Sequence, residues 1–324
     1  MVGRNQHRNL PDFFRSNFGN AIVEIPSPGF VYRNGREVDL PATLVQNARE
    51  IGNYRRGILT LKNIVDQVKP DLVLNFLEPM TGVFKLLYND LTPVLSIGHQ
   101  FMMWHPCMKG AGNQGVQEFA MRRYLGVTGT RSRLAGLSFA REEDVPNSRL
   151  FVCPPLLRSE LFSLRVCDGD YLLVYLVNDG YESGIIEWHR SNRDVPIHCF
   201  YDKKGMQKVN RVDATLTFHA LDGELFLQMM AGCRGVACTA GFESVCEAAY
   251  FGKPLLMVPI ENHVEQRLNA QDAQVHGLGI AGKDFDLSPL LQKKKLCATS
   301  RFQEWVNGAE ERFLKLIEET EQFT

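Results

Sequence analysis

Short apolar runs alternate with segments of helical periodicity along the chain. In the second half, the runs 171–177, 195–201, 214–218, 235–239 and 254–259 each have the length of a buried strand. The stretches between them repeat apolar positions at the spacing of a helix. Strands that alternate with helices in this way predict a doubly wound parallel α/β sheet, which binds its ligands at the carboxyl ends of the strands.

The first half shows the same alternation in a less regular form. Apolar runs at 94–98 and 134–140 predict strands, and residues 71–77 are apolar enough to predict a strand buried on both faces of a parallel sheet. Residues 41–68 predict one long helix, which Pro70 ends. We therefore expect two Rossmann-like α/β domains that face one another.

Residues 153–160, Cys-Pro-Pro-Leu-Leu-Arg-Ser-Glu, predict the linker between these domains, because two prolines hold the chain extended and remove two backbone donors. The expected N-terminal, acceptor-side domain covers residues 1–157. The expected C-terminal domain covers residues 158–299, and the amphipathic segment 300–324 predicts a helix that packs across the domain interface.

The two ends of the chain carry separate predictions. The first strand of a doubly wound sheet is normally internal, and residues 1–9 are too polar to supply it. We therefore expect the first domain to lack its N-terminal strand and helix, and to show an open sheet edge near 71–77. At the other end, Trp305 and Phe313 are expected to hold the two domains together.

Composition and charge exclude several classes of protein. The 36 Lys and Arg residues nearly balance the 37 Asp and Glu residues, which argues against broad binding of nucleic acid or of an anionic membrane. No apolar run approaches the ~20 residues of a membrane helix, and the N-terminus does not resemble a signal peptide. The 8 cysteines include no C-x-x-C pair, so no thiolate metal site is indicated. These features indicate a cytoplasmic protein.

The segment 239–247, Thr-Ala-Gly-Phe-Glu-Ser-Val-Cys-Glu, is the part of the chain most indicative of chemistry. Gly241 would let a ligand approach the backbone, and a helix that begins at Phe242 would offer free N–H groups to an anion. On that helix, Ser244 could bond a phosphate and Glu247 could accept both hydroxyls of a ribose. The segment predicts a nucleotide diphosphate site, although Ser244 acting as a helix cap beside a solvated Glu247 is an open alternative.

Two further segments give this site a family context. Residues 251–259, Phe-Gly-Lys-Pro-Leu-Leu-Met-Val-Pro, form a strand, and residues 261–270, Glu-Asn-His-Val-Glu-Gln-Arg-Leu-Asn-Ala, follow it. Together with residues 239–247 they resemble the donor-binding signature of nucleotide-sugar glycosyltransferases with two facing Rossmann domains, the GT-B type. The most similar kinds are the family 28 C-terminal domain and the UDP-glycosyltransferases.

The resemblance implies a role for each matching position. The implied sets are Thr239, Gly241 and Ser244 for the diphosphate, Glu247 for the ribose, Glu265, Gln266 and Asn269 for the donor sugar, and Phe218, His219 and Leu221 for the base. Two positions depart from plant-type members, which have Asn at position 243 and His at position 239, so the diphosphate pocket is less basic here. For Glu265 and Gln266, an exposed polar helix face is the alternative.

Polar residues also follow two predicted strands of the first domain. Asn75 and Glu78 end one of them, and His99 and Gln100 end the next, so all four should face the cleft. Glu78 and His99 are therefore the candidate catalytic residues, with a hydrogen-bonded wall residue as the alternative for His99. His7 is a poor candidate for the base, because it precedes a surface helix.

The resemblance implies transfer of a sugar from a nucleotide diphosphate sugar, a UDP-sugar by family expectation, to an acceptor hydroxyl with inversion. No cofactor or metal is expected, because the chain has no D-x-D motif and a helix N-terminus can neutralise the leaving diphosphate. The acceptor would be lipid-linked or a glycan, with at most peripheral contact at the inner face of the membrane. The apolar patch 101–104 could serve such a contact or pack in the core.

Two alternatives to a sugar transfer remain open from the sequence. One is a catalytically inactive nucleotide-sugar-binding or scaffold protein, which an absent first strand would favour. The other is a nucleotide-sugar 2-epimerase, which shares the two-domain architecture.

Overall fold

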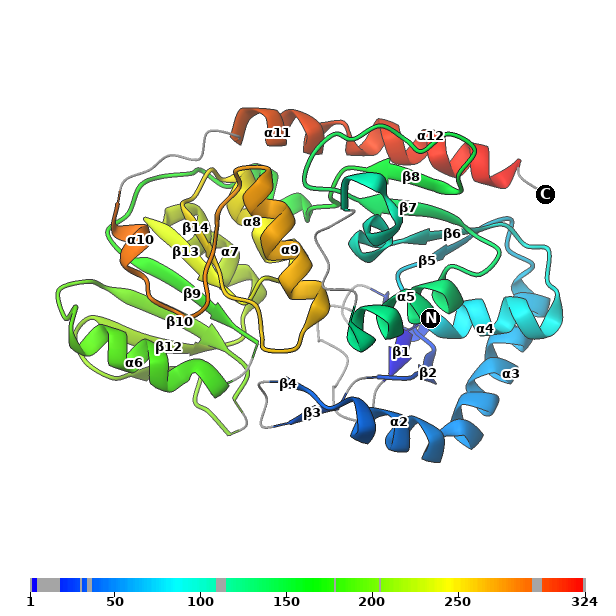
Figure 1. Cartoon of the computed structure of the whole chain (residues 1–324), viewed down its shortest axis with the longest axis horizontal. Helices are drawn as coiled ribbons and strands as arrows, with labels where there is room; N and C mark the ends of the chain where they lie inside the picture. Colours follow the sequence, from blue (N-terminus) through cyan, green and yellow to red (C-terminus); the bar gives the residue numbers. More distant parts are fainter. Residues whose placement is uncertain are drawn as a thin grey trace.

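The structure is a computed structural model with two α/β domains, joined along one side by the last two helices (Figure 1). It describes residues 2–4, 18–29, 31–33, 37–108, 115–177, 179–203, 205–292 and 299–322.

The second domain is a seven-stranded sheet in the order β11-β12-β10-β9-β13-β14-β15. Its strands are β9 (Leu172–Leu176), β10 (Ile197–Tyr201), β11 (Val209–Arg211), β12 (Leu216–Ala220), β13 (Gly235–Cys238), β14 (Leu255–Met257) and β15 (Ile280–Ala281). Every pairing is parallel except that of β11 with β12. The strand order reverses at β9, between β10 and β13, which is where doubly wound sheets bind ligands. The predicted sheet is confirmed.

The helices of the second domain are α6 (Glu182–Arg190), α7 (Gly223–Gly232), α8 (Phe242–Tyr250), α9 (Val264–Val275) and α10 (Ser288–Leu291). Asp222 caps α7 through its carboxylate, which accepts a hydrogen bond from the Leu225 N–H at 3.0 Å. The residues of β9, β10 and β13 are almost all buried, because helices cover both faces of the sheet. This core fixes the loop between β13 and α8.

The first domain contains a parallel four-stranded sheet in the order β5-β6-β7-β8 and two separate strand pairs. The sheet strands are β5 (Val73–Asn75), β6 (Val94–Ile97), β7 (Arg133–Leu137) and β8 (Leu150–Cys153), and the pairs are parallel β1 (Val2–Arg4) with β2 (Glu24–Pro26) and antiparallel β3 (Tyr32–Arg33) with β4 (Glu37–Val38). The helices are α2 (Leu40–Arg49), α3 (Ile51–Val68), α4 (Pro79–Tyr88) and α5 (Val116–Thr128).

The prediction that residues 71–77 form a strand buried on both faces is wrong. Leu74 and Phe76 are 46% and 64% exposed, because β5 is an edge strand that pairs only with β6 among the described residues. The expected open edge is therefore present. Residues before Leu10 do form a strand, β1, but it pairs with β2 and not with β5. His7 lies outside the described residues.

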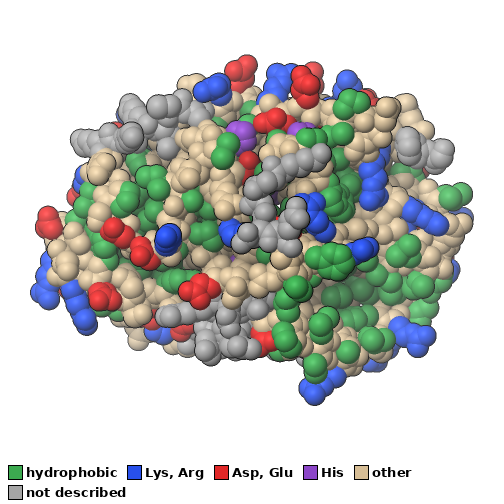
Figure 2. Space-filling model, in the orientation of Figure 1, with side chains coloured by type: hydrophobic (Ala, Val, Ile, Leu, Met, Phe, Trp, Pro, Cys, Tyr) green, Lys and Arg blue, Asp and Glu red, His purple; other side chains and the backbone are tan. Residues whose placement is uncertain are grey.

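Exposed apolar side chains accompany this open edge. Figure 2 shows hydrophobic side chains gathered over the lower right of the molecule, where Figure 1 places α2, α3 and α4. The exposed large apolar residues of these helices include Leu44, Val45, Ile51, Leu59, Val68, Leu86 and Leu87.

The predicted single helix 41–68 is two helices, α2 and α3, which meet at Glu50.

Two C-terminal helices, α11 (Thr299–Asn307) and α12 (Ala309–Glu321), stand where one was predicted, with Gly308 between them. They lie across both domains (Figure 1), since α11 contacts α8 while α12 contacts β6 and β8. Trp305 donates from Nε1 to the Ser138 carbonyl oxygen at 3.0 Å, and Phe313 is buried in the largest apolar core. Both residues thus join α11 and α12 to the domains beneath.

Candidate functional site

The β13–α8 loop leads into a helix start whose first backbone N–H groups are free. The first helical hydrogen bond runs from the Val245 N–H to the Gly241 carbonyl oxygen at 3.2 Å, so the N–H groups of residues 242–244 have no partner within the helix. A Cβ atom built at Gly241 would meet only the Thr239 carbonyl oxygen, at 3.6 Å. The space in front of the loop is therefore open to a ligand.

The two hydroxyl residues of the loop differ in exposure. Ser244 is half-buried and does not cap α8, so the capping alternative is wrong. Thr239 is fully buried, and its Oγ1 atom has no hydrogen-bond partner among the described residues. Only Ser244 reaches the open side of the loop without rearrangement.

Glu247 is held by an arginine that the sequence did not reveal. The Arg158 guanidinium donates to both carboxylate oxygens, from Nε at 2.6 Å and from Nη2 at 3.0 Å, and from Nη1 to the Gly223 carbonyl oxygen at 2.9 Å. Glu247 is 5% exposed, so the solvated alternative is wrong. A buried carboxylate and a half-exposed guanidinium therefore stand together one turn into α8.

A second carboxylate, Glu243, lies in the first turn of the same helix. The Glu243 side chain touches solvent, but the protein that surrounds it restricts its hydration. This burial, reinforced by the charge of Glu247 and opposed by Arg158, raises the pKa of Glu243 to about 7. Its charge therefore changes near neutral pH.

The three α9 residues assigned to the donor sugar have different surroundings. Gln266 is buried, and its Oε1 accepts from the Ile260 N–H at 2.9 Å. Asn269 is also buried and donates from Nδ2 to the Ala240 carbonyl oxygen at 3.0 Å. Both side chains hold loops in place. The alternative interpretation of Gln266, as part of an exposed polar helix face, is therefore wrong. Glu265 is half-buried, and burial raises its pKa. A hydrogen bond from Gln100 of the first domain opposes this effect.

His99 has the surroundings of a wall residue at the domain boundary. Its ring stacks on Phe242, the first residue of α8, with centroids 4.2 Å apart, and lies 5.0 Å from the Phe139 ring. Its Nδ1 atom is 2.6 Å from the Leu137 carbonyl oxygen. Burial lowers the pKa of His99, so the neutral ring is favoured.

Glu78 is the other candidate for a catalytic residue, and it caps α4. Its Oε1 accepts from the Ser27 hydroxyl at 2.7 Å and from the Met80 N–H at 3.1 Å, and burial raises its pKa. Burial, followed by the charges of Glu78 and Glu265, raises the pKa of Tyr124. The charges of two carboxylates, one from each domain, therefore act on the same tyrosine.

Asn75 supports Glu78 from the end of β5. Its Oδ1 accepts from the Glu78 N–H at 3.0 Å, and its Nδ2 donates to the Ser96 hydroxyl and to the Thr128 carbonyl oxygen, each at 3.2 Å. These bonds tie the candidate base to the first-domain sheet.

The residues assigned to the base offer little side-chain contact. Phe218 is fully buried against Tyr201, so its side chain cannot contact a bound base. The His219 ring pairs through Nε2 with Nδ1 of His198 at 2.9 Å, and burial followed by the charge of His198 lowers its pKa to about 4. Of these three residues, Leu221 alone is half-exposed.

Three other observations concern metals, membranes and the apolar patch. Among the residues that the structure describes, no three His, Cys, Asp or Glu side chains gather as a metal site would require. Within the same ranges, no helix is both long and apolar enough to span a bilayer. Phe101, Met102 and Met103 are buried, so the patch 101–104 packs in the core.

Comparison with solved structures identifies the fold class. The chain is similar to CalG4, the calicheamicin glycosyltransferase (TM-score 0.58, 15% identity, 95% of this chain and 88% of that one). It is also similar to MurG of Acinetobacter baumannii (0.51, 16%, 95% and 88%) and to the glycosyltransferase VinC in complex with DTDP (0.52, 11%, 94% and 88%). The two Rossmann-like domains thus form a GT-B fold.

A family model described as glycosyl transferase family 1 matches residues 5–296, and the chain therefore belongs to that family. It is a glycosyltransferase. No curated protein matches the chain.

Proposed function

We propose that this glycosyltransferase moves a sugar from a UDP-sugar to an acceptor hydroxyl, without a metal ion and with inversion of the anomeric centre. The observation that carries the proposal is the open N-terminus of α8 with the buried carboxylate of Glu247 one turn further along. The N–H groups of residues 242–244 would bind the diphosphate, and Glu247 would bind the ribose. The backbone beyond β12 would recognise the base.

Arg158 supplies the positive charge that Thr239 and Glu243 do not. Its guanidinium donates to both oxygens of Glu247. Ribose hydroxyls that bind this carboxylate would compete with Arg158, which could then reach the neighbouring diphosphate. A guanidinium is well suited to phosphate oxygens, and there it would stabilise the leaving group as negative charge develops.

On the acceptor side, Glu78 is the proposed general base. Its raised pKa brings a carboxylate closer to the range in which it removes a proton effectively at neutral pH. It caps α4 just beyond β5, and, after burial, its charge and that of Glu265 on α9 both raise the pKa of Tyr124. A glycan or a lipid-linked acceptor would place its hydroxyl there. Contact with the membrane would be peripheral, from the cytoplasmic side.

The donor nucleotide is tested most directly by turnover. The chain is incubated with panels of UDP-sugars and dTDP-sugars, since VinC was solved with DTDP, and release of nucleotide diphosphate is measured with and without EDTA. Release from UDP-sugars that EDTA does not change would support the proposal. Binding without turnover would indicate a nucleotide-sugar-binding protein, and a product epimerised at C2 would indicate an epimerase.

Glu265 is expected to bind the sugar and not the nucleotide. Replacing it with alanine should weaken binding of the intact nucleotide sugar by about 1.5–3 kcal/mol, the loss of one hydrogen bond to a charged group, while affinity for free nucleotide diphosphate stays nearly constant. Calorimetry with both ligands measures the difference. Gln266→Ala is the companion variant, and equal losses for the two ligands in both variants would place these residues outside the sugar site.

Donor affinity should fall as the pH rises through 7. Glu243 has its pKa raised to about 7, so it is mostly neutral at pH 6 and mostly negative at pH 8, when it repels the diphosphate. We expect affinity to drop by up to about tenfold over this interval, one pKa unit of interaction. An intact nucleotide sugar is the ligand to use, because its diphosphate lacks the terminal phosphate that titrates near pH 6. In Glu243→Gln the dependence should disappear.

A further inference from the structure

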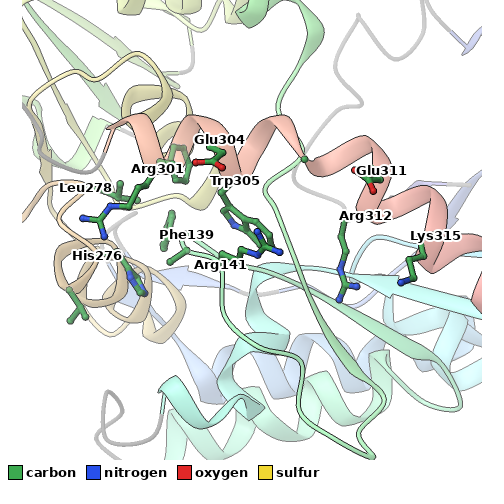
Figure 3. A pocket seen from close by; sticks show the side chains of 14 residues that line it. Phe139, Arg141, His276, Leu278, Arg301, Glu304, Trp305, Glu311, Arg312 and Lys315 are labelled. Carbon is green, nitrogen blue, oxygen red and sulfur yellow. The ribbon is translucent and has the colours of Figure 1, made fainter.

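A hollow of about 790 Å³ lies beneath the two C-terminal helices, at the boundary of the two domains (Figure 3). The first domain contributes Phe139 and Arg141, which follow β7. The second domain contributes His276 and Leu278, which follow α9. The remaining wall comes from α11 and α12. A molecule in this hollow would contact both domains and both helices that join them.

Three cations of this wall have no partner among the described residues: Arg141, Arg301 and Lys315. They come from the first domain, α11 and α12 respectively. Figure 3 shows Arg301 and His276 at the same end of the hollow, Arg141 beside Trp305, and Lys315 further along α12.

The other charges of the wall are partly neutralised. Arg312 binds the carboxylate of Asp144, and His276 lies 3.2 Å from Asp272. Glu304 and Glu311 also line the hollow, within one helical turn of Arg301 and Lys315. These two carboxylates lower the net positive charge but leave Arg141, from the opposite wall, uncompensated.

We propose that this hollow binds a multivalent phosphate, either a phosphorylated small molecule or a short polyphosphate, that bridges Arg141 and Arg301. Guanidinium groups bind phosphate oxygens in pairs, and two of them on opposite walls can share one ligand with several phosphate oxygens. The half-buried Trp305 ring gives the hollow an aromatic surface against which an attached organic group can pack.

The hollow lies close to the β13–α8 loop of the proposed donor site. The Phe139 ring lies 4.7 Å from the ring of Phe242, where α8 begins. Arg141 is two residues beyond Phe139. A ligand that draws Arg141 toward Arg301 therefore acts one layer of packing away from the N-terminus of α8, and it also fixes the two domains relative to one another.

Trp305 provides a local reporter for this site. The chain has 3 tryptophans, so Trp104→Phe with Trp188→Phe leaves Trp305 alone in the hollow. Titration with inorganic tripolyphosphate should change its fluorescence in a saturable manner. When Arg141→Gln and Arg301→Gln are added to this single-tryptophan variant, its affinity for tripolyphosphate should fall at least tenfold. Arg190→Gln, an exposed arginine on α6, is the matched control and should leave the response unchanged.

Two results would overturn the proposal. One is the absence of a saturable change up to about 10 mM tripolyphosphate, beyond the millimolar range of weak binding. The other is a response that persists in Arg141→Gln but is lost in Arg158→Gln, because tripolyphosphate would then act from the donor site, where Arg158 is the proposed phosphate ligand. Arg141 lies on the surface, so this single variant should fold, and circular dichroism verifies it. The proposal does not depend on the donor nucleotide.

Discussion

Replacing Glu247 with alanine is expected to weaken binding of nucleotide diphosphate by about 1.5–3 kcal/mol, roughly a 10- to 150-fold loss of affinity. The proposed interaction is a pair of hydrogen bonds from the ribose hydroxyls to a carboxylate that is only 5% exposed. Water cannot easily replace these bonds in the cleft, so their loss should be nearly complete. Isothermal titration calorimetry with UDP and dTDP measures the change, and unchanged affinity would remove Glu247 from the ribose site.

Arg158 makes a second variant necessary for this interpretation. Alanine at position 247 leaves the Arg158 guanidinium without its bidentate partner, so part of any loss could come from its rearrangement. Arg158→Ala separates the two effects. If Arg158 moves to the diphosphate, as proposed, affinity should fall about 10- to 150-fold, because one charge-assisted hydrogen bond contributes about 1.5–3 kcal/mol. If Arg158 only competes with the ribose for the Glu247 carboxylate, the affinity of Arg158→Ala for nucleotide diphosphate should rise.

The second domain could be predicted from sequence because its pattern is local. Each central strand is an apolar run buried on both faces, and Asp222 marks the start of α7 as a side-chain cap should. The two strands that were missed, β11 and β15, are short and largely exposed, so they lack the apolar signal of the central strands. Their pairing is decided by the neighbouring strands and not by their own residues.

The first domain was predicted less well because burial there depends on distant partners. Residues 71–77 have the composition of a central strand, yet β5 has one paired neighbour among the described residues and exposes Leu74. The break between α2 and α3 at Glu50 also leaves no clear sign in the apolar spacing, which continues across it. Hydrophobic periodicity identifies the elements, but it does not show which edge of a sheet stays open.

The candidate site shows the same division between local and distant information. The β13–α8 loop and its polar helix face follow from residues within one turn of each other. The ion pair of Glu247 with Arg158 joins positions 89 residues apart, and no spacing in the sequence connects them. Gln266 and Asn269 were located correctly on α9, but their hydrogen bonds to loop backbone depend on the packed structure.

Replacing Lys253 with alanine is expected to destabilise the protein by about 3–5 kcal/mol, the largest loss of stability among these predictions. Lys253 belongs to the Gly-Lys-Pro part of the donor-binding signature, yet it is 2% exposed and donates from Nζ to the carbonyl oxygens of Cys167, at 2.6 Å, and Cys233, at 2.8 Å. Alanine would leave the buried Cys233 acceptor unpaired, which costs about 1–3 kcal/mol, would remove the part-buried bond to Cys167, and would also open a cavity. Lys253→Met fills the same volume without the donor, so it should recover the cavity part only. Urea denaturation followed by circular dichroism measures both variants, and a loss below about 1 kcal/mol for Lys253→Ala, within the range of a surface substitution, would show that these bonds contribute little.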